Sequence, residues 1–278
     1  GSKPEDLMRH ANTALHKAKS EGRDLTRLFT PVMGTAADKY LKIETQLRYA
    51  VSRNQLLTYF QPQLNRAEEI TGVEVLMRWN NPELGIIPPT TFIPIAEESG
   101  LIIPIGDWLL QSVSDQLSTT LKSSVHNKLQ TISINISPNQ FYQQDFVAQV
   151  EKTLGNRVSK KPVIILEITE SLLLRNMDET IKKMTYLKRL GYQFSIDDFG
   201  TGYSSLSYIQ SLPIDELKID QSFVKNMHID KQQETIVETI IMMARKLQIS
   251  VVAEGVENAM QLKLLKDLGC DIYQGFHF

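Results

Sequence analysis

Residues 163–200 have the sequence VIILEITESLLLRNMDETIKKMTYLKRLGYQFSIDDFG, and this stretch decides the fold class. An apolar β-rich run, Val163–Thr169, precedes an amphipathic helical pattern over Asp178–Leu190, and a second β-rich run, Gln193–Asp198, follows it. A helix between two short strands is typical of the crossover that joins parallel strands. The stretch therefore predicts an α/β protein with a mostly parallel sheet.

The same alternation continues along the chain in both directions. Strands are expected at Leu57–Gln61, Gly72–Trp79, Thr131–Ser137, Val163–Thr169, Gln193–Asp198, Glu216–Ile219, Ser250–Glu254 and Cys270–Gln274. Helices are expected at Pro104–Thr119, Asn139–Leu154, Asp178–Leu190, Tyr203–Ser211, Asp230–Leu247 and Ala259–Leu268. Eight strands separated by helices in a chain of 278 residues favour a TIM-like (β/α)8 barrel over an open sheet. The first interval, Leu64–Thr71, is shorter than the roughly dozen residues of a parallel crossover, so the first strand should be antiparallel to the second.

Two helical patterns precede the barrel. Residues Glu5–Phe29 predict one helix that ends near Gly22, and Ala36–Ser52 predict another. We therefore expect an N-terminal helix over residues 1–30, a linker with a lead-in helix over 31–52, and the barrel over 53–278.

Composition excludes several classes of protein. A net charge of -2 and a pI near 6.3 argue against a long nucleic acid as partner, but not against a small phosphorylated ligand. The single cysteine, Cys270, excludes an intramolecular disulfide and suits the cytoplasm. No apolar run approaches the roughly 20 residues that span a bilayer. A membrane anchor of the full-length protein would therefore lie in N-terminal segments outside this chain.

Oxygen-bearing side chains stand at or near the C-terminal ends of five expected strands. They are Glu74, Asn135, Glu167, Asp197 and Glu254. Because the C-terminal ends of barrel strands surround one mouth, these side chains should converge on a divalent-metal site. Side-chain alternation also places Glu74, Leu76 and Arg78 on one face of the second strand.

The charges expected at this mouth do not balance. Six acids, Glu74, Glu167, Glu170, Asp197, Asp198 and Glu254, face only two cations, Arg78 and Lys218. Some acids would have to be protonated unless two divalent ions balanced them, and the adjacent pair Asp197 and Asp198 suits a bridge between metals about 3.5–4 Å apart. All-oxygen ligands favour Mg²⁺ or Mn²⁺ over zinc. A single acid at a strand end is usually a cap or a solvated side chain, so the prediction depends on the whole set.

Several motifs occur in a fixed order along the chain. They are Tyr59–Pro62, Glu74–Arg78, Asn135–Ser137, Glu167–Glu170, Asp197–Gly202, Lys218–Asp220, Ala253–Glu257 and Gln274–Gly275. In this order the chain, from about Ala36 to Phe278, closely resembles the EAL-domain cyclic-di-GMP phosphodiesterases. An ordered series is far more specific than the glycine-rich turn at Gly200 and Gly202 alone, for which an ordinary βα loop is the alternative.

The resemblance implies a role for each matching residue. Glu74, Asn135, Glu167 and Asp197 match the ligands of one metal, and Asp197, Asp198 and Glu254 match those of a second. Lys218 matches the lysine at the catalytic water, and Glu170 matches the glutamate that supports the glycine loop. The catalytic group is thus Glu74, Lys218, Glu254, Asp197 and Glu170. The substrate-binding positions are Gln61, Leu76, Arg78, Asn135, Asp198, Glu257 and Gln274, with Arg78 at a phosphate.

The resemblance also implies an activity and partners. The expected reaction is hydrolysis of cyclic-di-GMP to linear 5′-pGpG with two Mg²⁺ or Mn²⁺ ions, with Ca²⁺ inhibitory. A homodimer is expected through the glycine loop and the following helix. Residues Asp6–Phe29 resemble the terminal helix of a GGDEF domain, so the full-length protein is expected to carry upstream GGDEF and sensory domains.

Two departures and two alternatives accompany this interpretation. The first departure is Val75, which replaces the family's alanine but should point away from Glu74. The second is that the chain stops at Phe278, before a segment that usually follows in the family. A catalytically silent cyclic-di-GMP receptor is the main alternative, although such relatives have typically lost metal ligands or the glycine loop. An unrelated metal-dependent barrel hydrolase would require an accidental match of the ordered motifs.

Overall fold

The computed structural model describes residues 4–20, 24–120, 129–155, 157–158, 162–173, 176–201 and 209–278. The chain forms two compact units, which we call the N-terminal unit and the barrel unit. The N-terminal unit comprises Gly1–Leu56 and Trp79–Leu101, and the barrel unit comprises Leu57–Arg78 and Ile102–Phe278.

A closed eight-stranded sheet forms the barrel. Its strands are β1 (Leu56–Asn65), β2 (Ile70–Asn81), β4 (Thr131–Asn135), β5 (Val163–Thr169), β6 (Gln193–Phe199), β7 (Glu216–Ile219), β8 (Ser250–Ala253) and β9 (Ile272–Tyr273). The order β1-β9-β8-β7-β6-β5-β4-β2 closes through a β1–β2 pairing. β1 is antiparallel to β9, whereas the pairs from β2 through β4 to β9 are parallel. The predicted TIM-like barrel with an antiparallel first strand is therefore confirmed.

The side chain of Asn65 explains why the first connection is so short. Its Oδ1 accepts hydrogen bonds from the backbone N–H groups of Ala67 and Glu69, at 2.9 and 3.0 Å. An asparagine that bonds its own downstream backbone in this way stabilises a tight turn. The chain can therefore reverse between β1 and β2 without a helix.

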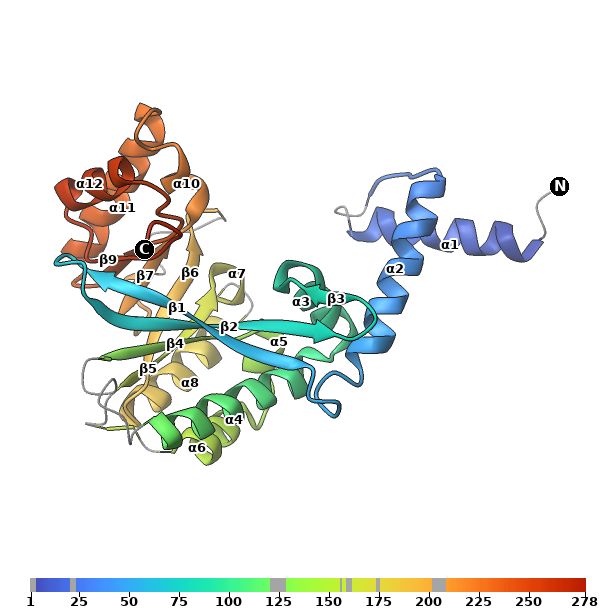
Figure 1. Ribbon diagram of the computed structural model, residues 1–278, viewed down its shortest axis with the longest axis horizontal. Helices are drawn as coiled ribbons and strands as arrows, with labels where there is room; N and C mark the ends of the chain where they lie inside the picture. The colour runs from blue at the N-terminus through green and yellow to red at the C-terminus, as the bar shows by residue number, and fades with distance from the viewer. Residues whose placement is uncertain are drawn as a thin grey trace. The chain divides into compact units, whose positions relative to one another are not determined.

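Helices cover the outside of the barrel (Figure 1). They are α4 (Ile102–Thr120), α5 (Pro138–Phe141), α6 (Phe146–Leu154), α7 (Glu170–Leu173), α8 (Met177–Arg189), α10 (Gln221–Lys225), α11 (Lys231–Lys246) and α12 (Ala259–Leu268). Strand residues such as Val75, Ile134 and Leu217 are buried in the hydrophobic core with these helices. Because strand side chains alternate, the next residues on these strands point into the barrel. That interior holds the polar residues Ser133 and Lys218.

The helix expected over Asn139–Leu154 is instead two helices, α5 and α6. Helix α5 ends after Phe141, and Lys183 Nζ on α8 donates to the carbonyl oxygens of Phe141 and Gln143, both at 3.0 Å. A cation from a neighbouring helix thus binds carbonyls that a continuous helix would have used internally. The helix expected at Tyr203–Ser211 falls largely on residues 202–208, outside the described residues.

The N-terminal unit contains α1 (Pro4–Ser20), α2 (Pro31–Leu47), β3 (Gly85–Ile87) and α3 (Pro89–Ser99). The predicted first helix was too long, because Asp24 has a φ of +50° and residues 25–30 are not helical. Helix α2 begins at Pro31, earlier than predicted, since proline suits the first turn of a helix. Buried Trp79 donates from Nε1 to Gln55 Oε1 at 3.1 Å.

Neither β3 nor α3 was predicted, because the three prolines at 88, 89 and 94 obscure the helical pattern. Tyr40 joins α2 to α3 by donating to Glu98 Oε2 at 2.7 Å. Among the described helices of the whole chain, none combines the length and apolarity required to span a bilayer.

Candidate active site

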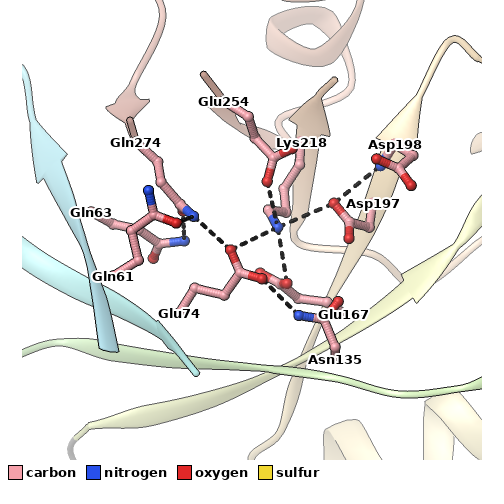
Figure 2. Close-up of polar contacts among 10 residues, drawn as sticks. All are labelled: Gln61, Gln63, Glu74, Asn135, Glu167, Asp197, Asp198, Lys218, Glu254 and Gln274. Carbon is pink, nitrogen blue, oxygen red and sulfur yellow. Dashed lines mark hydrogen bonds and ion pairs between the residues drawn. The ribbon is translucent and has the colours of Figure 1, made fainter. Parts of the chain in front are cut away.

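Lys218 stands at the centre of the polar barrel interior and is only 1% exposed. Its Nζ lies 3.2 Å from Glu74 Oε2, 3.0 Å from Glu167 Oε2, 3.1 Å from Asp197 Oδ1 and 2.7 Å from Glu254 Oε1 (Figure 2). These carboxylates come from β2, β5, β6 and the residue after β8. Four carboxylates therefore share one ammonium group, and we call these five residues the lysine cluster.

Amide side chains fix the orientation of Glu74. Asn135 Nδ2 donates to its Oε1, and Gln274 Nε2 donates to its Oε2, both at 2.6 Å. Gln274 Nε2 also lies 3.1 Å from Gln61 Oε1, and Gln274 Oε1 accepts from Gln63 Nε2 at 3.0 Å (Figure 2). Hydrogen bonds to a carboxylate stabilise its charged form. This network therefore holds Glu74 ionised and facing Lys218.

Gln274 depends on the glycine that follows it. A Cβ at Gly275 would overlap the backbone of Val256. Gln274 N donates to Ala253 O, and Gln274 O accepts from Val256 N, so the two segments lie against each other. A glycine at this position permits that approach.

A backbone irregularity directs two consecutive aspartates into the site. Regular alternation would place Asp197 and Asp198 on opposite faces of β6. However, the β6–β7 register shifts between Ile196 and Phe199, and Asp198 has a φ of +53°. A β-bulge of this kind re-aims side chains. As a result, carboxylate oxygens of Asp197, Asp198 and Glu254 lie within 4.8 Å of one another, a geometry that could hold a metal ion.

Burial strongly perturbs the site's titration. It raises the pKa of Glu167, with a further contribution from Glu74, and it raises the pKa of Glu254 to about 7 and of Asp198 to about 6. Burial also acts to raise the pKa of Glu74, but Lys218 and the hydrogen-bond donors outweigh it and lower that pKa. Burial opposes the charge of Lys218, yet the surrounding carboxylates raise its pKa. The site therefore carries an excess of acid that cations would relieve.

Sequence reasoning assigned no role to several interior residues. Glu216 shares the inward face of β7 with Lys218, and burial raises its pKa to about 7. Ser195 lies beside Glu216 in the β6–β7 register. The hydroxyl of Ser133 has no hydrogen-bond partner in the described part of the chain. Gln63 was also missed, although it has the same strand parity as Gln61.

Four of the predicted residues form no hydrogen bond or ion pair, within the described residues, with the lysine cluster or with the amides around Glu74. Arg78 Nη1 donates to Met77 O at 2.8 Å, and Leu76 precedes it on the same face of β2, partly buried. Glu170 begins α7, is 9% exposed, and neither carboxylate oxygen has a hydrogen-bond partner among the described residues. Glu257 is exposed in the loop after β8. Neither Glu170 nor Glu257 therefore has a contact with the lysine cluster that would support its predicted role.

Residues 44–278 match the profile of the EAL domain. The chain belongs to the EAL domain family. It is 37% identical over 278 residues to the cyclic di-GMP phosphodiesterase PdeR of Escherichia coli, and this match covers 100% of the chain and 42% of PdeR. It is also 37% identical over 277 residues to the bifunctional diguanylate cyclase/cyclic di-GMP phosphodiesterase MucR of Pseudomonas aeruginosa, covering 99% of the chain and 40% of MucR. This EAL domain chain thus spans about two fifths of the length of both relatives.

Solved structures agree with this assignment. A structure described as PaMucR phosphodiesterase in complex with c-di-GMP has a TM-score of 0.79 and 39% identity, over 85% of this chain and 95% of that one. The cGMP-bound form of the EAL enzyme Bd1971 has a TM-score of 0.76 and 36% identity, over 87% of this chain and 67% of that one. The EAL barrel fold of this chain is therefore shared with enzymes.

Proposed function

We propose that this EAL domain hydrolyses cyclic-di-GMP to linear 5′-pGpG with two Mg²⁺ or Mn²⁺ ions. The observation that carries the proposal is the lysine cluster: four carboxylates, three from strands and one from the residue after a fourth strand, lie within 3.2 Å of one buried ammonium. The chain is 37% identical to relatives named cyclic di-GMP phosphodiesterases. Every position that matches a metal ligand of the family carries a carboxylate or amide side chain in this chain.

The donor set fits hard divalent ions, because every donor is a carboxylate or amide oxygen. Glu74, Asn135, Glu167 and Asp197 would hold one ion, and Asp197, Asp198 and Glu254 would hold the other. Two such ions supply an activated water and polarise the phosphate.

The remaining roles belong to cationic and polar side chains of the chain itself. Lys218, which contacts the proposed ligands directly, would orient the attacking water by donating to its oxygen. Arg78 would bind a phosphate oxygen, while Gln61 and Gln274 would donate to the nucleotide. The bond from the water oxygen to phosphorus would form as the P–O3′ bond breaks. The water would give up one proton and the departing O3′ would take one up, which leaves a 5′-phosphate and a 3′-hydroxyl.

Product analysis tests the proposal directly. The chain is incubated with cyclic-di-GMP and Mg²⁺, Mn²⁺ or Ca²⁺, and pGpG is quantified by ion-exchange chromatography. Product is expected with Mg²⁺ or Mn²⁺ and not with Ca²⁺, and Glu74→Gln and Asp197→Asn should abolish it while circular dichroism stays unchanged. Binding of nucleotide with no product under any metal would instead indicate the silent receptor.

We also propose that residues 1–30 are the end of a GGDEF domain, residues 31–52 a linker and lead-in helix, and residues 53–278 the EAL barrel. The matches to PdeR and MucR support this, because they extend N-terminal to residue 44, where the EAL profile begins. A full-length structure tests it. Packing of residues 4–20 anywhere other than at the end of a cyclase-type domain would contradict the assignment.

A homodimer through the glycine loop and the following helix also remains a proposal, because residues 202–208 lie outside the described chain. Glu170, which matches the glutamate that supports the glycine loop in the family, would hold that loop in place. Light scattering at several protein concentrations, with and without cyclic-di-GMP, measures the oligomeric state. A mass that stays monomeric throughout would contradict the dimer.

A further inference from the structure

Tyr59 is an exposed aromatic residue on the strand face that enters the site. Gln61 and Gln63 occupy the same face of β1, because both bond to Gln274 inside the barrel. Since side chains alternate along a strand, Tyr59 belongs to this face as well. Tyr59 is nonetheless 51% exposed. The ring therefore stands at the mouth with much of its surface free.

Arg78 lies against this ring. Its guanidinium carbon is 5.5 Å from the centroid of Tyr59, because antiparallel β1 starts beside the end of β2. Within the described residues Arg78 forms no ion pair, although Glu74 of the lysine cluster lies on the same strand face. A tyrosine ring and a guanidinium group together form a surface suited to stacking of nucleic-acid bases.

The distance along β2 limits what can reach both ends of this face. Arg78 lies four positions after Glu74, and a strand rises about 3.3 Å per residue, so the two are about 13 Å apart along β2. That span exceeds a single phosphodiester group. Leu76, which lies between them, adds an apolar contact surface. A ligand that contacts both the acidic cluster and Tyr59 must therefore carry a large group beyond the scissile phosphate.

We infer that Tyr59 stacks on a purine base of the substrate and makes the site prefer a purine dinucleotide to a simple phosphodiester. This inference rests on the proposed function and adds a specificity-determining residue to it. It assigns no step of bond cleavage to Tyr59. The cyclic dinucleotide would place one phosphate at the acidic cluster and a base on the ring, with Arg78 beside both the ring and the second phosphate.

The test compares two substrates and several variants. Cyclic-di-GMP carries purines, whereas bis(p-nitrophenyl) phosphate is a short activated phosphodiester without a purine. Tyr59→Ala should raise KM for cyclic-di-GMP roughly 5- to 150-fold, the range expected when one base–aromatic stack is lost, and leave kcat nearly unchanged. Hydrolysis of bis(p-nitrophenyl) phosphate should not change. Tyr59→Phe should keep the wild-type KM, and Tyr59→Leu should resemble Tyr59→Ala.

Tyr186→Ala is the matched control, because Tyr186 is a similarly exposed tyrosine on the outer helix α8. It should alter neither substrate's kinetics. If Tyr59→Ala impaired hydrolysis of both substrates by the same factor, the inference would be overturned, since the ring would then act only by holding Arg78. An unchanged KM for cyclic-di-GMP would also overturn it.

Binding of cyclic-di-GMP, measured by calorimetry in EDTA, separates this inference from the proposed function. If the wild type binds the nucleotide but never cleaves it, the proposed function fails. The inference is then decided by whether Tyr59→Ala weakens binding by the same factor. A wild type that neither binds nor cleaves cyclic-di-GMP overturns both.

Discussion

Replacement of Lys218 by methionine tests the electrostatic basis of the site. Methionine keeps most of the apolar stem and removes the ammonium that four carboxylates share. Removing one partner of a buried ion pair costs about 3–5 kcal/mol, because the remaining charge is left buried and unpaired. We therefore expect Lys218→Met to lower the free energy of unfolding of the metal-free protein by about 3–5 kcal/mol near pH 8.

The loss should depend on pH in a defined direction. Burial already raises the pKa of Glu167 and raises that of Glu254 to about 7, with Lys218 opposing both shifts. Without Lys218 these carboxyl groups should hold protons to higher pH. A carboxyl whose pKa is raised by folding contributes stability at low pH that is lost as the pH rises through the folded value. The variant should therefore be least destabilised near pH 5.5 and progressively more destabilised toward pH 8.

Urea unfolding in EDTA at pH 5.5 and pH 8, followed by circular dichroism, measures this effect. Lys188→Met is the control, because its ion pair with Asp215 is partly exposed and should contribute at most about 1 kcal/mol. Added Mn²⁺ should restore more stability to Lys218→Met than to the wild type, since a divalent ion replaces the missing charge. The reasoning would be refuted if both lysine variants lost the same free energy of unfolding, or if the loss in Lys218→Met did not depend on pH.

Three further substitutions test other parts of the barrel. Folding raises the pKa of Glu216 from 4.5 to about 7, so its contribution is present below pH 4.5 and lost as the pH rises through 7. Between pH 5 and pH 8 the free energy of unfolding should therefore fall by up to about 3 kcal/mol less in Glu216→Gln than in the wild type. Urea unfolding at several pH values measures this, and the same pH dependence in both proteins would contradict it. Asp198→Asn should weaken Mn²⁺ binding at least about tenfold by calorimetry, and wild-type affinity would exclude it as a ligand. Val75→Ala should cost about 1–3 kcal/mol of stability with kcat unchanged, whereas a changed kcat would show that this position reaches the site.

Strand parity predicted the barrel and much of its interior. Glu74 and Val75 point to opposite sides as alternation requires, one into the lysine cluster and the other into the hydrophobic core. Parity could not reveal how adjacent Asp197 and Asp198 both bring carboxylate oxygens close to Glu254, because the bulge depends on pairing with β7. Charge counting correctly indicated excess acid, but it could not show that Lys218, rather than Arg78, is surrounded by the carboxylates.

Tertiary contacts explain the other differences between prediction and structure. The break between α5 and α6 is stabilised by Lys183 on a different helix, so no local pattern marks it. Glu170 and Glu257 were assigned by motif order alone, and their roles remain predictions. Gln63 could have been found from its parity with Gln61, but its partner, Gln274, lies more than 200 residues away in the sequence.

The bulge in β6 has a consequence for how this strand can vary. A regular strand offers a barrel interior only every second side chain, whereas β6 contributes two acids in succession while its neighbours stay regular. A change in the length of β6 should therefore disturb the site more than an exchange among its apolar residues. Only Asp197 and Asp198 lie between Ile196 and Phe199, so deletion of either would remove the extra residue of the bulge, leave a single acid there and shift the start of the glycine turn by one position.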